Sequence, residues 1–369
     1  MMFYYLEILS ACILGMLLGG IIIPRIYLVS FRCRLFDYID SRKIHHTKVP
    51  RLGGIAFFPC IFLSVSFIAI FHYLITKYDL FAHEFTPMRM LTLFACLFVI
   101  YLLGVTDDLI GVKYRSKLSL QILCAFLMVC SGCYLNSLYG LFGISEIPVW
   151  IGIPLSVFVC VYIMNAINFI DGIDGLASSI AIIAFAAFAI MFAILNWWMY
   201  ALIASASVGV LLLFFYFNVV GMSKKRKIFM GDTGSLTIGL LLSILVIRLS
   251  IYAPNKESIL PNGFVIAFSF LIVPLLDVVR VVLLRLRQGK SPFLPDRNHI
   301  HHKFITLGLS THQTLVCIIG IVLGFICLNI ILIQFLSINA LVLIDIIVWI
   351  MLHILVSKQI KKNNTIIKQ

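Results

Sequence analysis

Long apolar stretches recur along the whole chain and limit what it can fold into. Eleven of them reach the roughly 18–25 residues that a helix needs to cross the hydrocarbon core of a bilayer. The pattern predicts an all-α polytopic membrane protein with about 11 transmembrane helices. The expected spans are 3–24, 53–75, 89–106, 118–135, 148–167, 177–196, 199–217, 234–252, 262–284, 313–335 and 339–357.

The composition agrees with one membrane-embedded unit. Of 369 residues, 62% are hydrophobic and only 12% are charged, whereas about a quarter of the residues of a soluble domain are charged. No long linker or low-complexity segment divides the chain. We therefore expect a single integral membrane domain over residues 1–369, in which 358–369 form a basic cytoplasmic tail.

The basic residues predict the orientation of the spans. When the loops are numbered alternately from the N-terminus, the even loops and the C-terminal tail carry 23 of the 28 Lys and Arg residues. Cytoplasmic loops of membrane proteins carry such an excess. The N-terminus is therefore expected outside and the C-terminus in the cytoplasm. The net charge of +13 is mainly a sign of this topology, and the chain has no separate basic domain for nucleic acid.

Polar clusters gather on the same predicted cytoplasmic side. Most of the fifteen acidic residues lie in these loops or at the span ends beside them, where ionisation costs less than at the bilayer centre. Five segments stand out: "HHTKVPRLGG" at 45–54, "GVTDDLIGVKYRSK" at 104–117, "NAINFIDGIDGLA" at 165–177, "KRKIFMGDTGS" at 225–235 and "DVVRVVLLRLRQGKSPFLPDRNHIHHKF" at 277–304. A compact bundle would bring them together.

Each cluster by itself has an ordinary structural interpretation. Loop charges solvate the inner face of many membrane proteins, and Asp-Gly pairs are common in turns. Asp232 precedes Thr-Gly-Ser and can simply begin a helix near 234. Asp277 and Arg280 can form an i,i+3 pair at a helix end, or approach the site if Pro274 kinks the span. We leave both possibilities open and count neither residue as catalytic.

Together, the five clusters predict chemistry on phosphates. Mg²⁺ prefers oxygen ligands and takes one or two protein groups besides phosphates and water, a role that suits Asn168 and Asp232. Asp171 and Asp174, three residues apart, would share a face on a helical turn. Cations and donors for phosphate oxygens come from the basic and histidine residues Lys48, Arg51, Arg297, His299, His301 and His302. The sequence therefore predicts metal-assisted phosphoryl transfer at the membrane boundary.

Five motifs carry a family resemblance. "KVPRLGG", "DDLIGV", "NAINFIDGIDGLA", "FMGDTGS" and "HIHHKF" resemble, in order, motifs of the polyprenyl-phosphate N-acetylhexosamine-1-phosphate transferases, the MraY/WecA family, over about residues 1–357. The resemblance implies a multi-pass enzyme of the bacterial cytoplasmic (inner) membrane. Undecaprenyl phosphate would attack a UDP-N-acetylhexosamine and release UMP, which begins a cell-envelope glycan such as O-antigen, common antigen or teichoic acid. It also implies Mg²⁺, with Mn²⁺ as a substitute.

The same resemblance implies a role for each matching residue. Asp107 and Asp108 would form the paired-carboxylate motif at the lipid phosphate, and Asn168 and Asp232 would bind the metal. The Gly172–Ile173 backbone with Asp174 would recognise uracil. The remaining residues would act as follows: Phe229 stacks on the base, Lys48 lines the nucleotide pocket, His301 and His302 approach the pyrophosphate and sugar, and Asp171, Asn218, Arg297 and His299 complete the substrate-binding set.

The last cluster bears on the sugar. "PFLPDRNHIHH" resembles the branch that transfers GlcNAc-1-phosphate, whereas the muramoyl-pentapeptide branch has a third histidine followed by Phe-Glu. Here Lys303 and Ile305 occupy those positions. We expect UDP-GlcNAc, with another UDP-HexNAc or UDP-MurNAc-pentapeptide as alternatives. A transporter of an anionic solute is a more distant alternative, because transporters place polar groups near the midplane. A homodimer stays open.

Overall fold

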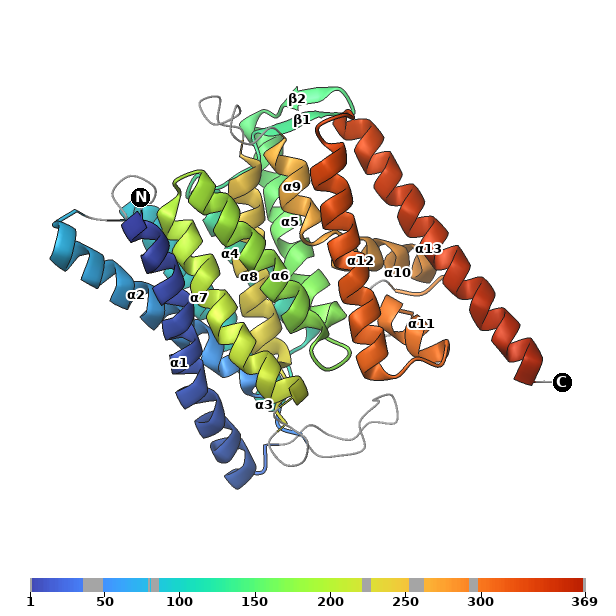
Figure 1. Ribbon diagram of the computed structural model, residues 1–369, viewed down its shortest axis with the longest axis horizontal. Helices are drawn as coiled ribbons and strands as arrows, with labels where there is room; N and C mark the ends of the chain where they lie inside the picture. Colours follow the sequence, from blue (N-terminus) through green and yellow to red (C-terminus); the bar gives the residue numbers. More distant parts are fainter. Residues whose placement is uncertain are drawn as a thin grey trace.

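The computed structural model describes residues 2–35, 49–78, 80, 86–220, 227–251, 262–291 and 298–367. Helices make up most of this part of the chain and are arranged as one bundle with a small hairpin at one end (Figure 1). The helices are α1 (Met2–Arg32), η1 (Gly53–Ala56), α2 (Phe57–Thr76), α3 (Pro87–Ile110), α4 (Tyr114–Cys130), α5 (Val149–Ile170), α6 (Leu176–Ile194), α7 (Trp198–Phe215), η2 (Tyr216–Val220), α8 (Gly231–Ser250), α9 (Gly263–Ser269), α10 (Ile272–Arg287), α11 (Ile300–Thr306), α12 (Thr311–Leu332) and α13 (Ile338–Ile367).

The expected apolar stretches all coincide with helices, but the count of spans differs. Among the described residues, nine helices are long and apolar enough to cross a membrane, or ten if α9 and α10 form one bent span. Helix α4, which matches the expected span 118–135, has 17 residues. An all-α polytopic membrane protein is confirmed, whereas eleven spans and their orientation remain predictions.

Helix α8 forms the centre of the bundle. Nearly all of its residues are buried inside the bundle, and it packs against α3 and α5. Small residues allow this close approach: a Cβ added to Gly239 of α8 would lie 2.7 Å from the Met164 Cα of α5. Helices that pack inside a membrane use small residues in this way. Helix α8 is therefore packed closely between its neighbours α3 and α5.

A bend separates α9 from α10. The two helices meet at 74°, and α10 runs across the bundle instead of along it (Figure 1). Pro274 is the third residue of α10, where the missing N–H costs no intrahelical hydrogen bond. The bend lies between Ser269 and Ile272, before Pro274. It directs α10 towards α11.

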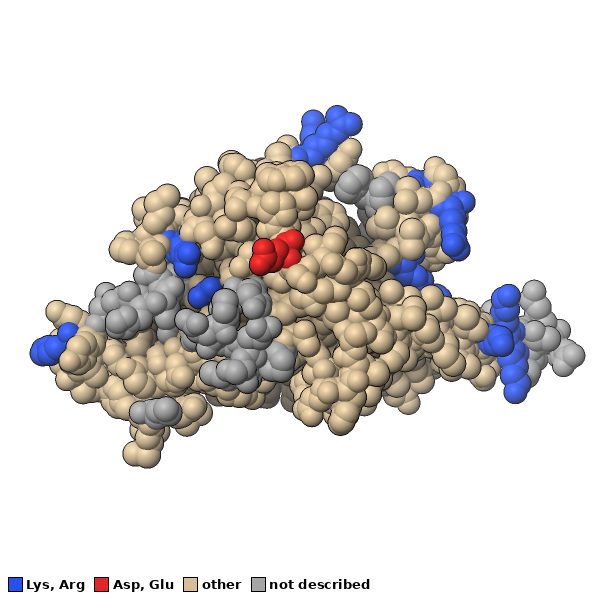
Figure 2. Space-filling model, turned by 90° about the horizontal axis from the view of Figure 1, so that it is seen from above, with Lys and Arg blue, Asp and Glu red and all other residues tan. Residues whose placement is uncertain are grey.

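The hairpin is an element that the all-α expectation omits. Strands β1 (Ser137–Leu141) and β2 (Ile144–Glu146) pair antiparallel through a turn in which Phe142 and Gly143 both have positive φ. Such a turn matches the twist of the strands. Asn339 of α13 accepts from the Phe142 N–H and donates to the Gly140 carbonyl. Seen from this end, the described surface carries a small acidic patch and separated basic groups (Figure 2).

Candidate active site

The end of α3 is joined to the beginning of α8 by one carboxylate. Asp108 Oδ1 accepts from the Asp232 N–H at 2.8 Å, and its Oδ2 accepts from the Thr233 N–H at 2.9 Å and hydroxyl at 2.6 Å. The first N–H groups of a helix need such partners. Gly104, one turn earlier, allows the approach, because a Cβ there would lie 2.7 Å from the Thr233 nitrogen. Asp108 thus fixes the position of Asp232.

A lysine links two of the predicted catalytic carboxylates. Lys117 of α4 donates to Asp107 Oδ2 at 2.8 Å and lies 3.2 Å from Asp232 Oδ2. The other oxygen of Asp107 accepts from the Val112 N–H at 2.7 Å. The side chains of Asp107 and Lys117 are only 10% and 15% exposed, whereas that of Asp232 is 30% exposed. Asp232 is therefore the member of this trio that is most open to a ligand.

The predicted metal ligands lie in direct contact. The Asn168 amide near the end of α5 donates to Asp232 Oδ1, and to the Ser235 hydroxyl at 2.8 Å. One carboxylate and one carboxamide suit Mg²⁺, which takes its other ligands from phosphate and water. Within the described ranges, no group of three His, Cys, Asp or Glu residues could hold a metal. The donor set thus fits a metal that is shared with a phosphorylated substrate.

The turn between α5 and α6 places two more carboxylates beside this centre. Residues 171–175 form a non-helical turn, so the shared face that Asp171 and Asp174 would have on a helical turn is not present. Burial, with the nearby charges of Asp232 and Asp174, raises the pKa of Asp171 to about 7. A carboxyl group that is half protonated near neutral pH adds less repulsion to a site for anions.

Asp174 lines a polar cavity of about 190 Å³ beside the turn between α5 and α6. It pairs with Lys227, whose ammonium also lies over the Phe229 ring, 5.2 Å from the centroid. Asn218 accepts from the Gly175 N–H at 2.6 Å and donates to the Ile228 carbonyl at 2.8 Å. It thereby ties the α5–α6 turn to the segment before α8. An acceptor, a cation and an aromatic face together suit a planar base with a phosphate.

The glycines of "RLGG" explain how the segment before α8 is held. Gly53 N–H donates to the Phe229 carbonyl and Gly54 N–H to the Met230 carbonyl, both at 2.9 Å. The Phe229 N–H donates in turn to the Pro50 carbonyl at 2.8 Å. A Cβ on Gly54 would lie 2.6 Å from the Met230 carbonyl oxygen. These contacts fix the backbone of Phe229, whose ring lies under the ammonium of Lys227.

Helix α11 is held by the charged pair of α10. Asp277 accepts from His299 Nδ1 at 2.8 Å and from the Ile300 N–H at 3.1 Å. Arg280 donates to Asp277 at 2.9 Å and also to the Asn298 carbonyl. The expected i,i+3 pair is thus present, and it also orients His299. Through these bonds Asp277 holds His299 and the start of α11, the helix that carries His301 and His302.

His301 lies directly on the α5–α6 turn. It is 1% exposed, and neither ring nitrogen has a hydrogen-bond partner among the described residues. A Cβ added to Gly172 would collide with its Nε2. Burial, with His302 and His299 nearby, lowers the pKa of His301 to about 3. A neutral, buried imidazole without partners is uncommon in folded proteins and is suited to a ligand.

The structure brings together most of the predicted site and adds residues that the sequence did not assign. Asp107, Asp108, Asn168 and Asp232 form one bonded network through Lys117 and the start of α8, and the side chain of Ile173 is buried. His302 is half-buried beside His301. Lys48 and Arg297 lie outside the described residues. The added residues are Lys117, Lys227 and Asp277, each of which belongs to a polar cluster that the sequence singles out.

Comparison with known proteins shows to which family the chain belongs. The model of Glycosyl transferase family 4 matches residues 90–250. The chain is 30% identical, over 95% of its length and 88% of the relative, to a Bacillus subtilis (strain 168) protein named "Probable undecaprenyl-phosphate N-acetylglucosaminyl 1-phosphate transferase". It is 30% and 29% identical to the undecaprenyl-phosphate alpha-N-acetylglucosaminyl 1-phosphate transferases of Escherichia coli (strain K12) and Yersinia pestis, over 79% of this chain and 74% of each relative. The chain therefore belongs to the polyprenyl-phosphate N-acetylhexosamine-1-phosphate transferases, the MraY/WecA family.

Proposed function

We propose that this chain transfers GlcNAc-1-phosphate from UDP-GlcNAc to undecaprenyl phosphate in the bacterial cytoplasmic membrane, on the cytoplasmic face. An oxygen of the lipid phosphate attacks the β-phosphorus of the UDP-sugar. The bond between that phosphorus and the bridging oxygen breaks, and UMP leaves with the bridging oxygen. The product is undecaprenyl-pyrophosphoryl-GlcNAc, the first lipid-linked intermediate of a cell-envelope glycan.

The contact of Asn168 with Asp232, together with the Lys117 bridge to Asp107, is the observation that carries this proposal. Two anionic phosphates repel each other as they approach, so catalysis requires positive charge placed before the reaction begins. Asn168 and Asp232 would hold Mg²⁺, which would share charge with both phosphates. Lys117 bridges the two carboxylates, offsets their mutual repulsion and adds a fixed ammonium beside them.

Asp107 positions the lipid phosphate in this account. A lipid phosphate is already largely ionised near neutral pH, so removal of a proton is not required for the attack. Both Asp107 oxygens are bonded, to the Val112 N–H and to Lys117, which suits a fixed orienting group better than a mobile base.

The nucleotide would occupy the cavity at Asp174, Lys227 and Asn218, with Phe229 against the base. Its pyrophosphate would then extend past Gly172 towards His301. The ring nitrogens of His301 have no hydrogen-bond partner among the described residues and can bond phosphate or sugar oxygens. The fixed distance between these two regions sets which phosphorus meets the lipid phosphate.

The choice of GlcNAc over the pentapeptide nucleotide rests on the residue at position 303, which the sequence gives as Lys303. Its ammonium lies 3.3 Å from His353 Nδ1 and 3.2 Å from the Ser357 hydroxyl, both on α13. Position 303 thus belongs to a contact between α11 and α13, whereas the pentapeptide branch has a third histidine there.

The test is purified protein with Mg²⁺, undecaprenyl phosphate and a panel of UDP-HexNAcs, with UMP release as the readout. We expect turnover that stops with EDTA and returns with Mg²⁺, and UDP-GlcNAc as the best donor. Metal-independent turnover would reject the metal role, and preference for another UDP-HexNAc or for UDP-MurNAc-pentapeptide would reject the assigned sugar.

A further inference from the structure

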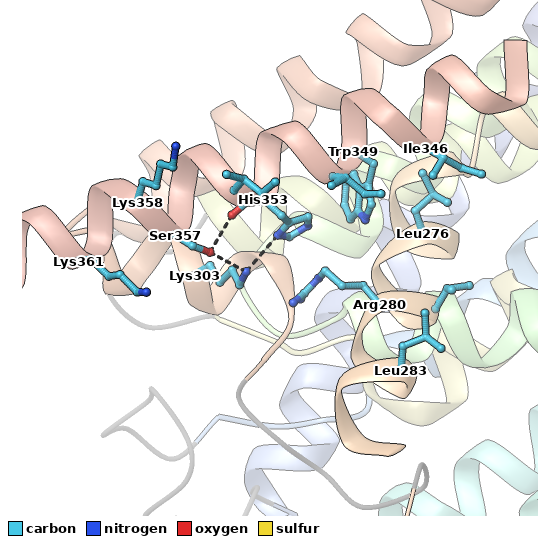
Figure 3. A pocket seen from close by; sticks show the side chains of 13 residues that line it. Leu276, Arg280, Leu283, Lys303, Ile346, Trp349, His353, Ser357, Lys358 and Lys361 are labelled. Atoms are coloured by element: carbon cyan, nitrogen blue, oxygen red, sulfur yellow. Dashed lines mark hydrogen bonds between the residues drawn. The ribbon is translucent and has the colours of Figure 1, made fainter. Parts of the chain in front are cut away.

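A groove of about 760 Å³ lies between α10, α11 and α13, apart from the proposed active site. None of the groups assigned to the metal, the nucleotide or the lipid phosphate lines it. Figure 3 shows Leu276, Ile346 and Trp349 at one end and Lys303, Ser357 and Lys361 at the other. The groove therefore has an apolar part and a polar part.

The polar part carries only positive charge. Four of the thirteen lining residues are Lys or Arg, and none is Asp or Glu. The hydrogen-bond partners of Lys303 are the His353 ring and the Ser357 hydroxyl, not a carboxylate. Burial, together with the nearby charge of Arg280, lowers the pKa of Lys303. An anion at this end would compensate the charge of Lys303.

Two buried side chains of α13 in the same groove have unused polar atoms. Trp349 is 4% exposed and His353 is 7% exposed, and both line the groove. Among the described residues, neither Trp349 Nε1 nor His353 Nε2 has a hydrogen-bond partner. Buried polar atoms are nearly always satisfied in folded proteins. A bound molecule with acceptor oxygens would satisfy them.

We propose that this groove binds an anionic phospholipid of the surrounding leaflet. Its phosphodiester lies against Lys303, Lys358 and Lys361, and an acyl chain follows Leu276 and the apolar face of α13. A juxtamembrane cluster of lysines attracts anionic headgroups in this way. Because Lys303 belongs to α11 and the other two lysines to α13, the lipid links α13 to the helix that carries His301.

The substrate lipid is a less suitable occupant. Its phosphate must meet Asp232 and Asn168, and neither residue lines the groove. On the groove wall, Arg280 is already bonded to Asp277 and to the Asn298 carbonyl. A phospholipid needs no access to the reacting phosphates, so its binding can be tested without activity.

The test uses the full chain in nanodiscs of phosphatidylcholine with increasing fractions of phosphatidylglycerol, and follows the thermal unfolding temperature of each variant against its own baseline in phosphatidylcholine. We expect the wild type to be stabilised at a low fraction of phosphatidylglycerol. Lys303→Met, and separately Lys358→Met with Lys361→Met, should raise the half-saturating fraction about fivefold for each lysine removed. Lys290→Met is the matched control, because Lys290 is exposed beyond the end of α10 and outside the groove.

Two results would overturn the proposal. An equal shift in Lys290→Met would mean that phosphatidylglycerol acts only through diffuse surface charge. A raised KM for undecaprenyl phosphate in the groove variants, without any change in the response to phosphatidylglycerol, would show that the groove takes the substrate. Native mass spectrometry adds an independent readout: retained phosphatidylglycerol should be seen on the wild type and lost from the double variant on α13.

Discussion

Replacing Lys117 by Met tests the bridge between Asp107 and Asp232. The change removes an ammonium that lies 2.8 Å from one carboxylate and 3.2 Å from the other, while it keeps most of the side-chain volume. Loss of one partner from a buried pair costs about 3–5 kcal/mol. Water reaches Asp232, whose side chain is 30% exposed, so we expect the free energy of unfolding to fall by about 2 kcal/mol.

The effect on turnover should exceed the effect on stability. Without Lys117, the two carboxylates repel each other and the incoming phosphates, and loss of one fixed electrostatic group at a reacting centre typically lowers kcat about 100-fold or more. The assay is UMP release at saturating Mg²⁺ alongside thermal unfolding. Lys113→Met is the matched control, because Lys113 is exposed four residues earlier and should keep wild-type kcat. Turnover of Lys117→Met within threefold of wild type would refute the reasoning.

Three further substitutions probe the other contacts. Asp108→Asn should lower the free energy of unfolding by about 1 kcal/mol and lower kcat as well, since Asp108 fixes Asp232; an unchanged unfolding temperature would contradict the capping role. Asp277→Asn weakens the anchor of α11 and should lower kcat with little change in the KM for the nucleotide; wild-type turnover would contradict the positioning role. Asp171 has a raised pKa of about 7, so the folded chain binds its proton more tightly than the unfolded chain, and this group's contribution to stability falls as pH rises from about 4 through 7. Asp171→Asn should therefore stabilise the protein more at pH 8 than at pH 5, and an equal gain at both pH values in thermal unfolding would argue against the shift.

The membrane helices could be predicted from the sequence because their signal is local. Each expected stretch is continuous and apolar, and length alone identifies a segment that can span a bilayer. Three features depend on more than apolar length: α4 has only 17 residues against 24 in α3 and 22 in α5, α9 and α10 meet at a sharp bend, and residues 137–146 form a hairpin that hydropathy does not indicate.

The sequence predicted most residues of the site, but only some of the contacts that these residues make. Asp232 and Asn168 could be paired from the chemistry of metal ligands. Asp108, by contrast, accepts hydrogen bonds from the first N–H groups of α8 with both of its oxygens. These residues are more than a hundred positions apart, so the sequence alone does not indicate the contact. Lys117 and Lys227 lie in basic segments whose charge the topology of the membrane protein already explains. Only the folded structure shows that these two lysines, unlike the other basic residues of the same segments, pair with carboxylates of the site.

The central claim is that Asn168 and Asp232 coordinate one metal ion that the substrate phosphates also bind. Electron paramagnetic resonance of Mn²⁺ bound to the purified chain, with UDP-GlcNAc present, tests it most directly. The account predicts one bound Mn²⁺ per wild-type chain, displaced by Mg²⁺, and its loss in Asp232→Asn and Asn168→Leu with folding retained. Occupancy equal to wild type in both folded variants would contradict the claim.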